Sequence, residues 1–143
     1  MIISDREIII VEYSTGTNWI EKLPHTNWLC VLVNNEKPRR YLDEVIKKII
    51  DNNVCYVCTV GLSCELTHDL IDEEIVFREV DSEKLYLPNH LIVTTWHTDF
   101  AEGISFAILN AQHGEVEIKK VVILDMTDGK ELNRINNLLT ILK

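Results

Sequence analysis

The chain has 143 residues, a size typical of one domain with a substantial core, and we expect a single domain over residues 1–143. Hydrophobic residues make up 46% and charged residues 26% of the chain, which is ordinary for a globular protein. Fourteen Lys and Arg against 23 Asp and Glu give a formal net charge of −9, which argues against nucleic-acid binding because neutralising phosphates requires clustered cations.

The first third of the chain predicts two strands and one helix. Residues 7–13 are rich in β-favouring side chains between charged ones, which predicts a strand. Residues 28–33 form a continuous apolar run, which is typical of a strand covered on both sides. After Pro38, apolar side chains recur at spacings of three and four over residues 41–50, with charges opposite, which predicts an amphipathic helix.

The middle of the chain predicts another strand and helix. Residues 54–60 form the next buried strand, which Gly61 ends. Ser63 stands where it can cap a helix that begins at Cys64. Residues 73–80 fit either an extension of this helix or an edge strand, and both alternatives stay open.

The last third repeats the alternation. Residues 91–93 are apolar and predict a strand buried on both faces, and the polar residues 94–99 follow at once. The next helix is expected to end at Gly114, which suits a helix C-terminus. A last strand lies within residues 119–126, and a helix follows over residues 132–142.

Strand and helix alternate four times from residue 28 onward. This alternation predicts a mostly parallel sheet of about five strands with helices on both faces, to which residues 7–13 add an edge. The predicted fold class is therefore a three-layer, Rossmann-like α/β domain.

The lack of recognisable targeting signals and the pattern of the cysteines predict a cytoplasmic protein. No apolar run approaches the roughly 20 residues that a helix needs to cross a bilayer, and the first residues lack the features of a signal peptide. We therefore expect no membrane contact and no disulfides among the four cysteines. Cys30 and Cys55 lie in apolar runs, where a thiol behaves as a small hydrophobic side chain.

Polar residues follow the predicted strands at their carboxyl ends, which is where open α/β sheets bind ligands. On this rule we expect ligand contacts from Thr95, Trp96, Asp125 and Asp128. Two of them have a structural alternative, since Trp96 suits packing and Asp128 suits the cap of the final helix. The rule rests on analogy between folds and does not identify a function.

His97 and Asp99 are the most suggestive catalytic candidates at this edge. A histidine titrates near neutral pH, and a neighbouring carboxylate can orient its ring and stabilise its charged form. The alternative is structural: Thr98 or Asp99 caps the following helix, Glu102 completes a capping box, and His97 is an ordinary loop residue.

Cys58 and Cys64 are candidate nucleophiles, and Cys64 is the better one because a helix N-terminus lowers the pKa of a thiol. Cys55 and Cys58 have the spacing of a redox or zinc motif, but in a strand they should point to opposite faces. A second pair of metal ligands is missing, so no metal is expected. No cofactor is predicted either, because the chain lacks the GxGxxG and GxxxxGK[ST] motifs.

The segment from Asp69 to Glu83 carries the densest charge in the chain. It is either a solvated helix face and loop, or a docking surface for a basic protein. The carboxylates that would form such a surface are Asp69, Asp72, Glu73, Glu74 and Glu79.

These features favour a non-catalytic binding or regulatory domain that acts through a protein partner, of the kind found among bacterial accessory proteins. Complementary charge would favour a basic partner, such as a toxin that the domain neutralises. The alternative is a small cytosolic enzyme or small-ligand sensor with its site at the carboxyl edge of the sheet, around His97 and Asp99. The sequence leaves open whether the protein is an enzyme.

Overall fold

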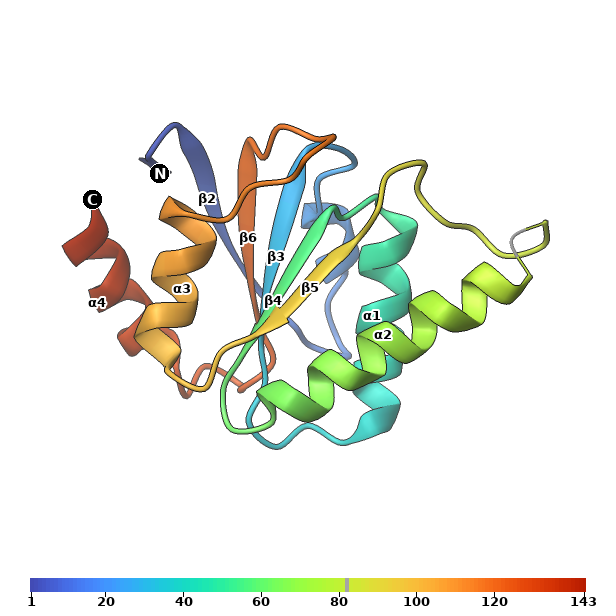
Figure 1. The fold of residues 1–143 in the computed structure, drawn as a ribbon. Coiled ribbons are helices and arrows are strands. Elements are labelled where there is room, and N and C mark those ends of the chain that lie inside the picture. Colours follow the sequence, from blue (N-terminus) through green and yellow to red (C-terminus); the bar gives the residue numbers. More distant parts are fainter. Residues whose placement is uncertain (82) are drawn as a thin grey trace.

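The computed structural model describes residues 1–81 and 83–143, which form a six-stranded sheet with four α-helices (Figure 1). The strands are β1 (Ile2–Ile3), β2 (Arg6–Glu12), β3 (Trp28–Val33), β4 (Tyr56–Val60), β5 (Val93–Trp96) and β6 (Lys120–Asp125). The helices are α1 (Arg39–Asp51), α2 (Cys64–Val80), α3 (Phe100–Leu109) and α4 (Leu132–Leu142), with a short 3-10 helix η1 (Trp19–Lys22).

The strands lie in the order β1-β2-β6-β3-β4-β5. Every neighbouring pair is parallel except β1 and β2, which are antiparallel. The predicted α/β class and the mostly parallel sheet are therefore confirmed.

Helices cover both faces of the sheet, α1 and α2 on one face and α3 and α4 on the other (Figure 1). Alternate side chains of a strand point to opposite faces, and β3 follows this rule. Leu29 and Val31 join the core under α3 and α4, while Cys30 and Leu32 join the core under α1 and α2. All six side chains of β3 are buried for this reason, which explains the continuous apolar run in the sequence.

The structure corrects both predictions about the edges of the sheet. β2 is not an edge strand, because β1 pairs outside it with Ile3 opposite Arg6, and the sheet has six strands instead of five. β5 is only partly buried, and Trp96 at its end is 47% exposed. Among the described residues, β5 is the outermost strand on the other side and pairs with β4 alone. Leu91, just before it, is 65% exposed.

Residues 73–80 extend α2, so the helical alternative is correct and the edge-strand alternative is wrong. α3 ends at Leu109, several residues before Gly114. Arg6 explains this early end, because its guanidinium donates to the carbonyl of Ala107 at 2.8 Å and also to that of Ala111. Across residues 1–81 and 83–143, no helix has both the length and the apolarity that a membrane span requires.

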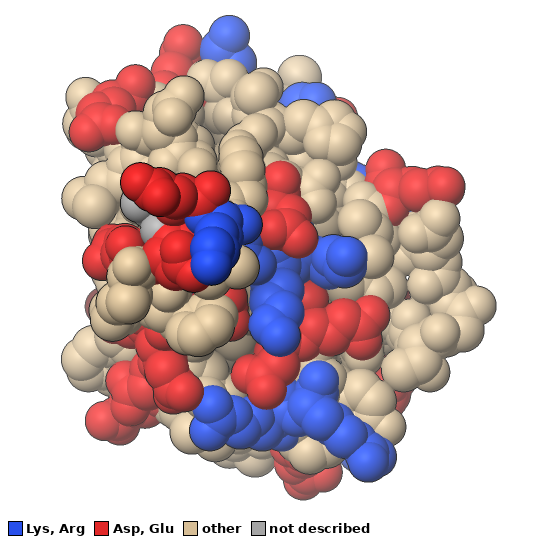
Figure 2. Space-filling view, turned by 90° about the vertical axis from the view of Figure 1, so that its right-hand side faces the viewer, with Lys and Arg blue, Asp and Glu red and all other residues tan. Residues whose placement is uncertain are grey.

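Acidic and basic side chains are interleaved over the α1 and α2 side of the molecule (Figure 2). Ion pairs join several of them: Arg39 lies 2.9 Å from Glu73, and Arg78 lies 2.8 Å from Glu74. The carboxylate of Asp51 accepts a further bond from Arg78 at 2.7 Å. The surface is therefore more mixed in charge than the acidic segment of the sequence suggests.

Candidate functional site

The strand order reverses between β3 and β6. From β3 the chain passes through α1 to β4 and through α2 to β5, moving outward in one direction. It then returns through α3 to β6, which pairs with the opposite side of β3. Open α/β sheets bind ligands beyond the carboxyl ends of the strands at such a point.

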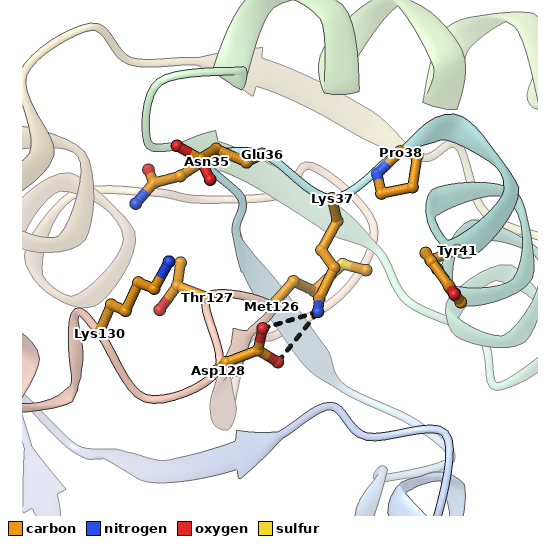
Figure 3. Close-up of a pocket in the computed structure, with 9 residues that line it drawn as sticks. All are labelled: Asn35, Glu36, Lys37, Pro38, Tyr41, Met126, Thr127, Asp128 and Lys130. Carbon is orange, nitrogen blue, oxygen red and sulfur yellow. Dashed lines mark hydrogen bonds and ion pairs between the residues drawn. The ribbon is translucent and has the colours of Figure 1, made fainter.

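A cavity of about 240 Å³ lies at this reversal point (Figure 3). The loop after β3, the first turn of α1 and the loop after β6 surround it. Pro38 and Met126 supply apolar wall, and the other lining residues are polar: Asn35, Glu36, Lys37, Tyr41, Thr127, Asp128 and Lys130. A concave site where polar groups converge beside apolar wall is a candidate small-molecule site.

Asp125 builds the loop that forms one wall of this cavity. Its side chain is buried at the end of β6 and accepts hydrogen bonds from the backbone N–H and the hydroxyl of Thr127, at 2.9 and 2.6 Å. It also accepts one from the N–H of Gly129 at 3.3 Å. Asp128 and Gly129 have φ values of +56° and +82°, which lie in the left-handed region that a non-glycine residue adopts only when its surroundings impose it. These bonds therefore fix the direction of the Asp128 side chain.

Lys37 projects from the opposite wall and forms an ion pair with Asp128 (Figure 3). Both carboxylate oxygens of Asp128 lie 2.9 Å from its Nζ. The backbone of Lys37 is fixed by buried Asn34, whose Oδ1 accepts from the Lys37 N–H at 3.0 Å. The Asp128 side chain is 65% exposed, so this ion pair contributes at most about 1 kcal/mol and a ligand can replace it.

Further positive charge lies beside Tyr41, although Arg40 itself is not part of the cavity lining. The guanidinium of Arg40 lies 4.8 Å from the ring centre of Tyr41 and donates to its hydroxyl at 2.9 Å. The Nζ of Lys37 lies 5.9 Å from the same ring centre. Within the described residues, no side chain caps the N-terminus of α1 and its first turn holds no acidic residue, so its free N–H groups and helix dipole add to the positive potential.

A second hollow, of about 470 Å³, lies at the same edge of the sheet, beside the N-termini of α2, α3 and α4. Asn35 lines both hollows and ties their walls together. Its amide donates to Glu131 at 3.2 Å and accepts from the Leu62 N–H at 3.0 Å. Its carbonyl accepts from the Ser63 hydroxyl at 2.6 Å, which is why Ser63 stands at the N-cap position of α2 without capping it.

The structure gives His97 and Asp99 separate partners. Asp99 caps α3, because its side chain accepts from the N–H of Glu102 at 2.9 Å, as the structural alternative predicts. The His97 Nε2 lies 2.9 Å from the Thr95 hydroxyl, which in turn donates to Cys58 at 3.6 Å. Burial lowers the pKa of His97, and the charge of Glu102 opposes this effect. A neutral His97 ring bonded to Thr95 is therefore the resting arrangement at neutral pH.

The four cysteines are free and buried. Burial raises the pKa of Cys58 to about 12 and that of Cys55 to about 11, so both thiols stay protonated at neutral pH. Cys64, at the first residue of α2, lines the second hollow. The expectation that Cys55 and Cys58 point to opposite faces is wrong, since β4 begins after Cys55 and both side chains join the same core.

Of the four predicted ligand contacts, only Asp128 lines the cavity, and Asp125 shapes it from beneath. Thr95 and Trp96 lie on β5, two strands away from β3. Sequence reasoning missed Lys37 and Lys130. The one signal in the sequence was that a lysine follows each of the strands β3 and β6. The sequence does not reveal that these two strands are neighbours, so the signal could not be used before the strand order was known.

The five predicted docking carboxylates fall into two groups on α2. Glu73 and Glu74 face α1 and pair with Arg39 and Arg78, as described above. The other three lie on a different side of the helix together with Glu65, at spacings of four, three and seven residues, and we call these four the α2 acidic stripe: Glu65, Asp69, Asp72 and Glu79. Among the described residues, no Lys or Arg forms an ion pair with the stripe, although His68 lies 3.2 Å from Asp69 and 3.4 Å from Asp72.

Residues 8–141 match the family described as Domain of unknown function (DUF7684), so the chain belongs to that family. No curated protein and no solved structure matches the chain.

Proposed function

We propose that this member of the DUF7684 family is a binding domain for a small ligand with an anionic group, a phosphate or a carboxylate, held in the cavity between β3 and β6. The observation that supports it most is the position of the cations. Although the chain carries a net charge of −9, Lys37 and Lys130 line the one point where the strand order favours a ligand, and Arg40 lies against Tyr41 beside it. These cations face two carboxylates of the same lining, Glu36 and Asp128.

The groups around the cavity suit an anion in two ways. An anionic oxygen can accept from the Lys37 ammonium and from the free N–H groups at the start of α1, and helix N-termini favour negative charge. Without a ligand, Lys37 is paired with Asp128, so its ammonium is already oriented by a carboxylate. A bound anion would replace Asp128 as the partner of Lys37. Asp128 also repels the ligand, which makes its charge a measurable term in the affinity.

Binding of inorganic phosphate, adenosine monophosphate and citrate, measured by calorimetry and by thermal shift, tests the proposal. For the anion that binds most tightly, Lys37→Ala/Lys130→Ala should lower the affinity by more than about tenfold, because two charged hydrogen-bond donors are lost. Asp128→Asn should raise the affinity by roughly two- to fivefold, because it frees Lys37 and removes a like charge. Lys119→Ala removes an exposed cation at the opposite end of β6 and should leave the affinity unchanged.

Three results would reject the proposal. The first is that none of the three anions stabilises the wild-type protein. The second is an equal loss of affinity in the Lys119→Ala control, which indicates a diffuse charge effect. The third is a lower affinity for the anion in Asp128→Asn, which means that the Asp128 carboxylate does not repel the bound anion and that the charge argument for this site is wrong.

A second candidate function is docking of a basic protein partner, which the α2 acidic stripe favours. Its carboxylates carry no in-chain Lys or Arg within the described residues, and Asp69 is 68% exposed. A partner such as a cationic toxin would associate faster through this field, and the rate would fall with salt. Affinity capture tests this candidate function with three proteins: wild type, Asp69→Lys/Asp72→Lys, and the control Glu115→Lys/Glu117→Lys. The partner should be lost only from the Asp69→Lys/Asp72→Lys variant. A partner that all three proteins retain equally contradicts docking through the stripe.

We also propose a finer description of the fold and of its compartment. The two helical layers on either side of a mostly parallel sheet support a three-layer, Rossmann-like classification. Four free cysteines support a reducing compartment, the cytosol. Fractionation of the native host and thiol labelling after denaturation test the assignment to the cytosol. Finding the protein in the periplasm or in the medium would contradict it.

A further inference from the structure

The free edge of β5 is an unused hydrogen-bonding surface. Over residues 1–81 and 83–143, β5 is the outermost strand and pairs only with β4 (Figure 1). The N–H groups of Val93 and His97 donate to the carbonyls of Cys55 and Thr59, at 3.1 and 3.0 Å. Since successive residues of a strand direct their backbone groups to opposite edges, those of Thr94 and Trp96 point away from the sheet.

This edge lacks most of the features that normally prevent a strand from pairing. Soluble proteins protect sheet edges with charged side chains, proline, bulges or very short strands, and of these only shortness applies to β5, which has four residues. The stretch from Leu91 to Thr98 contains no Lys, Arg, Asp, Glu, Pro or Gly, although 26% of the chain is charged. Leu91 and Trp96 at its two ends are 65% and 47% exposed. An incoming strand therefore meets open backbone groups and apolar side chains.

The α2 acidic stripe lies beside this edge and indicates what the incoming strand carries. The carboxylate of Asp72 accepts from the Thr94 hydroxyl at 2.6 Å, and the ring centres of His68 and Trp96 are 4.7 Å apart. A new strand next to β5 would direct every second side chain to the α2 face, toward Asp69 and Asp72. Cations at those positions pair with the stripe, whereas a second copy of this chain would bring a second acidic stripe and a net charge of −9.

On the opposite face β5 presents Val93 and Thr95, which carry no charge. Val93 packs against the core under α3, together with Phe106, whose ring centre lies 5.1 Å from that of His97. The side chains of an added strand that alternate with its cations would cover this face. Apolar, β-branched residues suit it because they favour extended backbone and pack on a half-buried sheet.

We propose that an extended segment of a partner protein, with Lys or Arg alternating with apolar residues, adds to the sheet as a strand along β5. Its main chain pairs with Thr94 and Trp96, and its cations lie over Asp69 and Asp72. This inference rests on the second candidate function, docking of a basic protein, and adds to it the place, the backbone mode and the sequence pattern of the segment.

Synthetic peptides titrated into the full chain test the backbone pairing. The probe is an eight-residue acetylated and amidated peptide of alternating Lys and Val, followed by fluorescence anisotropy. The control is a peptide of the same composition with its four Lys and four Val in blocks, which should bind about tenfold more weakly. Two further peptides are N-methylated at all Lys or at all Val. One of them should lose at least about tenfold in affinity and the other should not, because only one set of N–H groups faces β5.

Variants of the protein test the charge pairing. Asp69→Asn/Asp72→Asn should lower the affinity for the alternating peptide by about fivefold or more at low salt. Glu115→Gln/Glu117→Gln, with the same loss of charge on an exposed loop elsewhere, should leave binding unchanged. Circular dichroism of each variant establishes that it is folded before titration.

The outcomes separate this inference from the proposal on which it rests. If both N-methylated peptides and the block peptide bind as well as the alternating one, strand addition is refuted and docking by charge alone remains. If no basic peptide binds, both are refuted. If sedimentation instead shows a dimer that Thr94→Pro abolishes, the edge binds a second copy and the inference is wrong.

Discussion

Replacing Asp125 by alanine should destabilise the protein and disorder the wall of the cavity. The carboxylate is buried and accepts three hydrogen bonds, two of them from backbone N–H groups and one from the Thr127 hydroxyl. Thr127 is itself 5% exposed, so its N–H has little access to water once the acceptor is gone.

The expected size follows from these bonds. A buried donor that loses its acceptor costs about 1–3 kcal/mol, and the more accessible Gly129 N–H adds about 1 kcal/mol or less. Removing a buried charge returns part of this cost. A net loss of about 2–3 kcal/mol in the free energy of unfolding is expected, which lowers the Tm by roughly 6–12 °C for a chain of this length.

Urea denaturation of the wild type, Asp125→Ala and Asp125→Asn provides the measurement. Asparagine keeps one acceptor oxygen but places an N–H group opposite a donor. The free energy of unfolding of Asp125→Asn should therefore lie between those of the wild type and Asp125→Ala. The matched control is Asp128→Asn, which removes the exposed ion pair, keeps a side chain that tolerates the left-handed backbone, and should cost less than about 1 kcal/mol. Equal stability of Asp125→Ala and wild type would refute the assignment of Asp125 as the residue that builds the loop.

Three further predictions concern the rest of the fold. Gly103→Ala should cost about 1–3 kcal/mol, because its Cβ would lie 2.5 Å from Val60 Cγ1 and 2.8 Å from the Cβ of His97; an unchanged Tm would contradict this contact. Arg6→Gln should speed amide exchange at the C-terminal end of α3, because Arg6 holds the carbonyl of Ala107 in the last turn and that of Ala111 just beyond it; unchanged exchange would contradict this. In the folded protein the pKa values of Cys55 and Cys58 are raised to about 11 and about 12, whereas an unfolded chain has a thiol pKa of about 8.5. The two thiols contribute their full stability below the unfolded pKa, where both states are protonated, and this contribution is lost as the pH rises toward the folded pKa values. Stability should therefore fall above pH ~9 by up to about 1.4 kcal/mol per pH unit for each thiol, and the same slope in Cys55→Ala/Cys58→Ala would contradict it.

Sequence patterns predicted the central strands because each of them is covered on both faces. The apolar run of β3 and the spacing of three and four in α1 leave little choice of structure. At the edges of the sheet the same reasoning failed. Residues 91–93 look like a buried strand, yet β5 has one neighbour only, since an apolar run does not report how many strands flank it.

The candidate site was predicted less well, for a physical reason. The carboxyl edge of the sheet followed from the alternation of strands and helices, and Asp128 was selected on that basis. Which loops meet there depends on strand order, and β6 inserts between β2 and β3 although it comes last in the chain. Lys37 and Lys130 therefore come together across 93 residues of sequence (130 − 37), a distance that no local pattern spans.

The most direct test of the central claim is an NMR titration of the labelled protein with inorganic phosphate. Anion binding between β3 and β6 predicts saturable shifts of the backbone amides of Lys37, Arg39 and Arg40 and of residues 126–130, which Lys37→Ala/Lys130→Ala should abolish. The amides of β5 and of the loop around Glu115 should not move. Saturable shifts confined to those other regions, or no saturable shift at any residue, would contradict the claim that this cavity is the functional site.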